Sequence, residues 1–279
     1  MHSKCHYRNE VTNREMKVKG TQIIRVGKDT LSFTTTDPTN LEEPVTYEPY
    51  TVKSGISMSA NLREAFKERS SELIYDKTQV IIDSKVLMIP IERFSEGDTE
   101  LYYKHSFPAD SQQSIAHNVI PELNSVAVFS INKDVRLVLR DNVPGATVTH
   151  LMIPVWRHMF TRSFTGHRNK LYAYFHDKQL EVFSFQQNRF KFCNNYDASL
   201  GNDSLYFLLY VWKQLNLQPE HDEMHLFGDI PQREWLLEEL RRYLHNAYVI
   251  NPSAEFNRTP ATRIKDMPFD LVTLLTKGR

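Results

Sequence analysis

Residues 171–196 read LYAYFHDKQLEVFSFQQNRFKFCNNY, and this stretch decides the fold class. It divides into three runs rich in aromatic residues, separated by an Asp-Lys pair at 177–178 and by the short segment QQN at 186–188. Runs of this kind between short polar turns are typical of antiparallel strands joined by hairpins. The stretch therefore predicts three consecutive strands.

The same arrangement occurs near the N-terminus. TQIIRV begins at Thr21, a Gly-Lys-Asp turn and TLSFTTT follow, and residues 45–52 (VTYEPYTV) alternate as a strand does. Each half then continues into a helix, over 60–69 after the capping residue Ser59 and over 204–216. The run LYFLLYVW in the second of these helices is apolar on every side, so we expect it to be packed in the core.

Both halves go on with a strand, a helix, a strand and a helix. In the second half these are residues 224–227, 232–244, 247–250 and a last helix from Asp270. In the first half they are residues 125–131, 132–141, 147–152 and 154–162, if residues 76–123 are set aside as a small α/β insertion. We therefore predict an α/β protein with two tandem βββαβαβα lobes: a mobile extension at 1–19, a first lobe at 20–163 and a second lobe at 164–279.

Two such lobes in tandem resemble the actin-like ATPase superfamily, which has a duplicated ribonuclease-H-like fold. Residues 79–94 (QVIIDSKVLMIPIERF) and 125–155 are similar to the actin homologues of type IV pilus assembly. PVWRHMFTRSFTGHRNKLYAYF (154–175) and GDIPQREWLLEELRRYL (228–244) resemble a bacterial family of unknown function in that superfamily. The resemblance implies a fold, and it assigns no catalytic residue.

Glycine is scarce, and its spacing excludes several phosphate-binding motifs. The nine glycines are never closer than seven residues apart, which rules out GxGxxG, the Walker A loop and the GxSxG elbow. The resemblance implies an acid at the end of each lobe's first strand, glycines in both hairpin turns and paired glycines at the adenosine site. Here Asp29 follows Gly27, the turn at 177–178 has no glycine, and Gly228 stands alone. The phosphate loops are therefore eroded.

A nucleotide site is the alternative to this interpretation. Its candidate residues are Lys28, Asp29, Thr30, Asp177, Lys178 and Gly228. Lys28 and Lys178 occupy matching turns and could hold a phosphate as point charges, although lysine in an exposed hairpin turn needs no ligand. We expect no catalytic residue and no cofactor, and the alternative is a slow ATPase that binds ATP and Mg²⁺.

The sequence predicts no metal site. Asp177 and Glu181 flank the second hairpin, but a two-metal nuclease of this fold needs a further acid, and none is evident. His221 and His225 have the spacing of a helical zinc motif, but a strand would separate them by about 13 Å.

Lysine plus arginine and aspartate plus glutamate number 34 each, so any basic surface must be local. No acid occurs between Asp141 and Asp177, where basic residues alternate with aromatic ones. The candidate anion or partner surface comprises Arg157, Arg162, Arg168, Lys170 and Arg258. Such a stretch either contacts nucleic acid or forms a linking helix whose arginines pair with acids elsewhere.

The remaining features indicate a cytoplasmic protein. Cys5 and Cys193 are far apart, the N-terminus shows no signal peptide, and the longest apolar run, 205–212, is too short to span a bilayer. Our leading hypothesis is a non-catalytic interaction scaffold with a protein partner. Nucleic acid is the less favoured partner, and no direct membrane insertion is expected.

Overall fold

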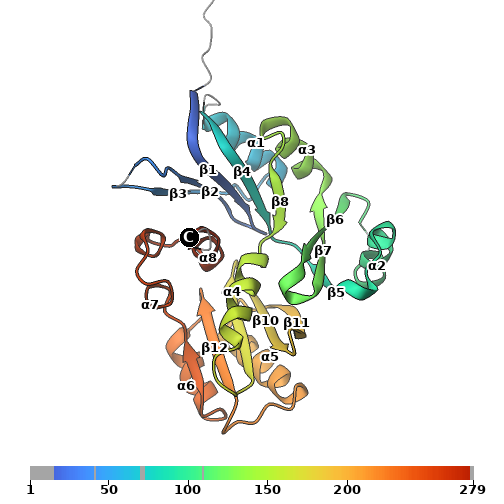
Figure 1. The fold of residues 1–279 in the computed structure, drawn as a ribbon, viewed down its shortest axis with the longest axis vertical. Helices are drawn as coiled ribbons and strands as arrows, with labels where there is room; N and C mark the ends of the chain where they lie inside the picture. Colours follow the sequence, from blue (N-terminus) through green and yellow to red (C-terminus); the bar gives the residue numbers. More distant parts are fainter. Residues whose placement is uncertain (1–15, 41, 70–72, 109, 277–279) are drawn as a thin grey trace, which may run out of the picture.

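The computed structural model describes residues 16–276 except 41, 70–72 and 109. It has two α/β lobes, which Figure 1 shows one above the other, with a smaller sheet beside the upper lobe. The predicted α/β fold with two lobes is confirmed. Within the described ranges, no helix combines the length and the apolar character needed to cross a membrane.

The first lobe is built on a five-stranded sheet in the order β3-β2-β1-β4-β8. Its elements are β1 (Met16–Val26), β2 (Leu31–Thr36), β3 (Val45–Tyr50), α1 (Met58–Glu68), β4 (Leu73–Ile82), α3 (Lys133–Asn142), β8 (Thr147–His150) and α4 (Ile153–Ser163). Ser57 rather than Ser59 caps α1, and its hydroxyl accepts a hydrogen bond from the Ala60 backbone N–H at 3.2 Å. β1 begins at Met16, so the last residues of the expected extension belong to a strand, and 1–15 lie outside the described residues.

The second lobe repeats this arrangement in the order β11-β10-β9-β12-β13. Its elements are β9 (Lys170–His176), β10 (Gln179–Gln186), β11 (Arg189–Asp197), α5 (Gly201–Gln214), β12 (Glu223–Gly228), α6 (Arg233–Arg241), β13 (Ala247–Val249), α7 (Pro252–Glu255), η4 (Pro260–Arg263) and α8 (Phe269–Thr276). In both sheets three antiparallel strands are extended by two parallel ones, as the duplicated pattern predicts.

The small sheet contradicts one strand assignment made from the sequence. It has the order β5-β7-β6, and β7 is the run that we expected to be the fourth strand of the first lobe. That place is taken by β4, which pairs parallel with β1. β7 is buried along almost its whole length, whereas the buried residues in the described part of β4 are Val80, Ile81 and Ile82 at its end, so hydrophobicity favours β7 for the place that β4 takes. The elements of this region are β5 (Val86–Pro90), η1 (Ile91–Arg93), η2 (Glu96–Asp98), α2 (Thr99–Ser106), β6 (Gln113–Ile120), η3 (Pro121–Leu123) and β7 (Ser125–Asn132).

Alternation along the first strands directs one set of side chains to the space between the lobes. In β9, Leu171, Ala173 and Phe175 pack with residues of α5 and α6. Tyr172 and Tyr174 belong instead to the core that includes Trp156 of α4 and Phe269 of α8. Figure 1 shows α4 and α8 between the two lobes. Polar residues at the ends of these strands therefore face the interlobe cleft.

The expectation that α5 is buried on every side is wrong. Leu208, Val211 and Trp212 are buried, but Tyr206 and Tyr210 are 62% and 48% exposed. The hydroxyl group of tyrosine keeps contact with water, so a tyrosine within an apolar run does not require burial. One face of α5 therefore carries two exposed aromatic rings.

Candidate functional site

Arg25 is the centre of the contact between the lobes. It lies near the end of β1 and is 2% exposed. Its Nη2 is 3.0 Å from Asp177 Oδ2 of the second hairpin, and its Nε is 3.0 Å from Asp270 Oδ1 of α8. Its Nη1 donates to Thr30 Oγ1 at 2.7 Å, and this hydroxyl donates to Asp177 Oδ1 at 3.0 Å. One guanidinium thus joins a first-lobe strand to the second lobe and to the last helix.

Tyr174 binds the same carboxylate from the second lobe. Its hydroxyl donates to Asp270 Oδ2 at 2.7 Å, and the hydroxyl oxygen accepts a hydrogen bond from the Asp270 backbone N–H at 3.3 Å. Burial raises the pKa of the Tyr174 phenol well above its ordinary value, so the phenol stays a donor. Asp270 itself is fully buried.

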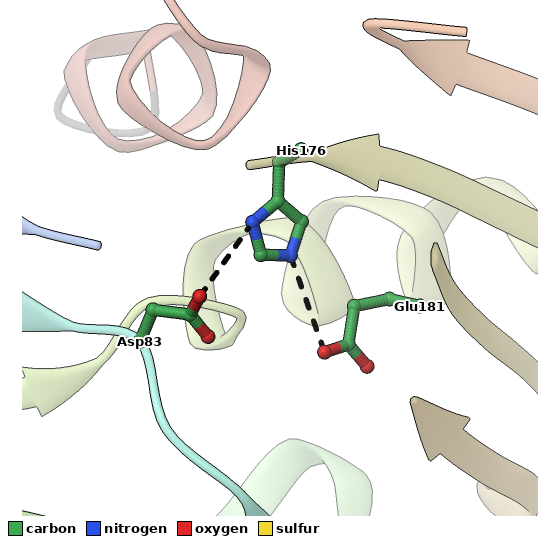
Figure 2. Close-up of side chains that lie close together, drawn as sticks. All are labelled: Asp83, His176 and Glu181. Carbon is green, nitrogen blue, oxygen red and sulfur yellow. Dashed lines mark ion pairs between the residues drawn. The ribbon is translucent and has the colours of Figure 1, made fainter. Parts of the chain in front are cut away.

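His176, at the end of β9, lies between two carboxylates, as Figure 2 shows. Its Nδ1 is 3.9 Å from Asp83 Oδ2, and its Nε2 is 4.0 Å from Glu181 Oε1. These separations exceed hydrogen-bond length, and neither ring nitrogen has a hydrogen-bond partner among the described residues. Asp83 directly follows β4 of the first lobe, whereas Glu181 lies in β10, so the group spans the two lobes.

The pKa values in this cluster are shifted by burial and by neighbouring charges. Burial raises the pKa of Glu181 to about 7, even though Asn195 donates to its Oε1 at 2.6 Å. Burial alone would lower the pKa of His176, but the carboxylates of Asp177, Asp83 and Glu181 outweigh it and raise that pKa. Burial opposes ionisation of Asp177, but His176 and Arg25 hold the pKa of this carboxyl below its usual range. The cleft therefore stabilises an ionised Asp177 beside Arg25.

A cavity of about 280 Å³ opens beside this network, and its lining includes Arg25, Asp177 and Gly228. Gly228 has a φ of +89°, and a Cβ at this position would lie 2.0 Å from the carbonyl oxygen of Phe175. Only glycine fits so close to the neighbouring strand. The single glycine at this position thus has a structural reason.

The structure places the six residues of the predicted nucleotide cleft in two groups. Thr30 and Asp177 belong to the Arg25 network, which we define as the hydrogen-bonded group of Arg25, Thr30, Tyr174, Asp177 and Asp270. Gly228 lines the cavity. Lys28, Asp29 and Lys178 are exposed at the turns. Hydrogen bonds from Ser199, assisted by the charges of Lys28 and Lys178, lower the pKa of the exposed Asp197 carboxyl. The two lysines therefore share an acidic neighbour.

The basic residues of the interlobe junction contact groups from other segments. Arg157 pairs with Glu122, Arg162 with Glu255, and Arg168 Nη1 lies 3.6 Å from Glu223 Oε1. Lys170 is buried, and its Nζ donates to Thr165 Oγ1 at 2.8 Å. Arg258 is exposed after α7. These contacts favour the interpretation in which acids elsewhere in the chain balance the acid-free stretch.

The sequence profile of the family described as "Protein of unknown function (DUF3822)" matches residues 16–247. The chain belongs to this DUF3822 family. No curated protein matches the sequence significantly. A solved protein of actin-like ATPase fold and unknown function from Bacteroides thetaiotaomicron is 26% identical, with a TM-score of 0.80 over 97% of this chain and 99% of that one. The PilM-PilN type IV pilus biogenesis complex is 11% identical, with a TM-score of 0.54 over 92% of this chain and 96% of that one.

The residues at the centre of the DUF3822 cleft are mostly ones that sequence reasoning missed. Arg25, Asp83, His176 and Asp270 were not among the predicted site residues. Arg25 did carry a signal, since it is a charged residue in the otherwise apolar strand end IIRV. Asp83 is a further acid beside Glu181, and it was not evident from the sequence because the segment containing it was assigned to the insertion.

Proposed function

We propose that this protein is a cytoplasmic, non-catalytic member of the actin-like fold that acts as a protein-interaction scaffold. The observation that carries the proposal is the Arg25 network. Arg25 and Thr30 of the first hairpin in the first lobe contact Asp177 of the first hairpin in the second lobe. In actin-like ATPases these two hairpins approach the nucleotide phosphates. A bound triphosphate would have to break the Arg25–Asp177 pair and place its charges near buried carboxylates, which is unfavourable.

The end of β1 also lacks the acid that would hold magnesium at this position. Actin-like ATPases have an acid at this strand end, whereas here Arg25 is the buried polar residue. Mg²⁺ binds oxygen ligands, and a guanidinium at this strand end offers none. The loss of the magnesium site supports a protein that does not hydrolyse ATP.

A surface on the second lobe suits a protein partner. Tyr206 and Tyr210 are exposed on α5, and their rings stack at 6.0 Å between centroids. Exposed tyrosines are typical of protein interfaces. The PilM-PilN complex, whose fold is similar, is a precedent for an actin-like protein in a complex with a protein partner.

Calorimetric titration of the full chain with Mg-ATP tests the non-catalytic part of the proposal. We expect no binding heat at micromolar to millimolar nucleotide. Micromolar binding would contradict the proposal and favour the alternative, a nucleotide site in the cavity beside Gly228. In that case the double variant Lys28→Ala/Lys178→Ala would lose affinity if these lysines hold the phosphates.

Affinity capture from cell lysate tests the scaffold part. We expect Tyr206→Ala/Tyr210→Ala to lose a specific partner that the unchanged protein retains. Tyr243→Ala is the matched control, because Tyr243 is 57% exposed but lies after α6. Equal capture by all three proteins would exclude the α5 surface. Nucleic-acid binding, the second alternative, has less support because Arg157, Arg162 and Arg168 are already paired.

A further inference from the structure

Asp83, His176 and Glu181 form a compact group of metal-ligating side chains. One ligand atom from each residue lies within 4.8 Å of the other two. Figure 2 shows the imidazole of His176 between the two carboxylates, Asp83 on one side and Glu181 on the other. Asp83 directly follows β4, His176 is the last residue of β9, and Glu181 is the third residue of β10. Two of the three side chains thus belong to strands and the third directly follows one, so the sheets position the group.

The polar atoms of this group lack the partners that buried polar atoms normally have. His176 and Glu181 are each 2% exposed, yet both ring nitrogens of His176 and Oε2 of Glu181 have no hydrogen-bond partner within the described part of the chain. His150, which is also buried, uses both nitrogens: Nε2 contacts the Ser84 carbonyl at 2.9 Å and Nδ1 accepts from the Met152 N–H at 3.2 Å. His176 is therefore unlike a histidine that only fills a core.

The charges around His176 suit a bound cation. Asp83, Asp177, Glu181 and Asp270 each lie within 4.0 Å of Arg25 or His176. Arg25 pairs with Asp177 and Asp270, and His176, whose Nδ1 also lies 3.6 Å from Asp177 Oδ2, is the basic side chain beside Asp83 and Glu181 in the described part of the chain. Buried carboxylates are normally paired or bound to a metal. A divalent cation bound by the neutral imidazole of His176 would balance the two charges of ionised Asp83 and Glu181.

We propose that Asp83, His176 and Glu181 bind one divalent transition-metal ion in the interlobe cleft. One imidazole nitrogen and two carboxylates suit Zn²⁺ or Mn²⁺ better than Mg²⁺ or Ca²⁺, which prefer oxygen ligands alone. Ligand atoms about 2.1 Å from a tetrahedral zinc lie about 3.4 Å apart, and these atoms lie within 4.8 Å of one another, so the side chains need to close by up to about 1.4 Å. His176 also lines the cavity, from which water can reach a fourth coordination position.

The position of the site gives the ion a role beyond the scaffold function proposed above. Asp83 belongs to the first lobe, and His176 and Glu181 to the second. The ion would therefore hold the lobes in one relative orientation. Asn195, which donates to Glu181 Oε1 at 2.6 Å, orients one ligand as outer partners of metal ligands commonly do.

Titration of the chelator-stripped full chain with ZnCl₂ tests the proposal. We expect one equivalent of zinc to bind at micromolar or lower concentration and to raise the melting temperature. His176→Ala, Glu181→Gln and Asp83→Asn should each weaken binding by at least about tenfold, the smallest change usual even for outer-shell partners. Circular dichroism shows which variants stay folded. If His176→Ala and Glu181→Gln do not fold, Asp83→Asn still tests the site, because it keeps the shape of the side chain.

Two controls separate this site from other zinc ligands. His225→Ala removes a buried histidine of the same sheet whose Nε2 lies 3.0 Å from Glu223, and it should keep the bound equivalent. His2→Ala/Cys5→Ser/His6→Ala removes the potential ligands near the N-terminus and should keep it too. Cobalt substitution should give a spectrum without thiolate charge transfer. The proposal is overturned if the unchanged protein binds no zinc, if the N-terminal variant loses it, or if the three cleft variants all retain full affinity.

Discussion

The two lobes place equivalent strand positions at the cleft and fill them with different residues. The backbone N–H of Asp83 donates to the Val26 carbonyl at 2.9 Å, and that of Asp229 donates to the Phe175 carbonyl at 2.9 Å. In both sheets the strand before these acids pairs parallel with the first strand. The shared register shows that the lobes are copies of one backbone plan.

By the same register, Arg25 in the first lobe is the counterpart of Tyr174 in the second. Both side chains bind Asp270 of α8, Arg25 as a charged partner and Tyr174 as a neutral donor. The lobes are thus joined by complementary groups at equivalent positions rather than by identical ones. A buried carboxylate held from both sides favours one closed arrangement.

Removing the charged half of this pair should have the largest effect. Arg25→Met leaves Asp177 and Asp270 buried without their cation, so we expect the free energy of unfolding to fall by about 3–5 kcal/mol. Urea denaturation measures this loss. The double variant Arg25→Met/Asp270→Asn should recover part of it, because the unpaired charge is also removed. A loss below about 1 kcal/mol would show that Arg25 does not hold the lobes together.

The glycine of the second lobe offers the next comparison. Gly228 is the counterpart of Ile82, which carries a full side chain without difficulty. Gly228→Ala combines a positive φ with a Cβ 2.0 Å from the Phe175 oxygen, so we expect a loss of about 3 kcal/mol. Gly145→Ala is the control, with a φ of +81° but open space around it, and should cost about 1 kcal/mol. If Gly228→Ala and Gly145→Ala lose equal stability in thermal unfolding, the close approach of the neighbouring strand is not the reason for the glycine at position 228.

The neutral half of the Asp270 pair should matter least. Tyr174→Phe deletes the hydroxyl that donates to Asp270 at 2.7 Å but leaves Arg25 in place. We expect a loss of about 1.5 kcal/mol, the value usual for a hydrogen bond to a charged group. Urea denaturation of Tyr174→Phe and Arg25→Met under the same conditions measures the difference between their free energies of unfolding. A larger loss for Tyr174→Phe would reverse the assignment of the charged partner as the main link.

The repeated strands could be predicted from residues 171–196 and from their counterparts after Thr21, because alternation and turn residues are local properties. The helix after β7 was likewise predicted to within a residue at each end, since Asn132 caps it through its side-chain oxygen. The assignment of β4 and β7 failed because β7 is the longer apolar run, whereas four polar residues at 76–79 interrupt β4, and only the strand pairing shows which of the two lies beside β1.

By itself, the sequence determined the duplicated lobe pattern and the lack of glycine in the turn at 177–178. Only the tertiary structure decided which side chains lie in the cleft. Arg25 and Asp270 are 245 positions apart in the sequence and are in contact because both lobes pack against α8. The same packing of the lobes places Asp83 of the first lobe beside His176 of the second. Local periodicity reports which face of a strand is buried, but it contains no information about which distant charge will lie opposite.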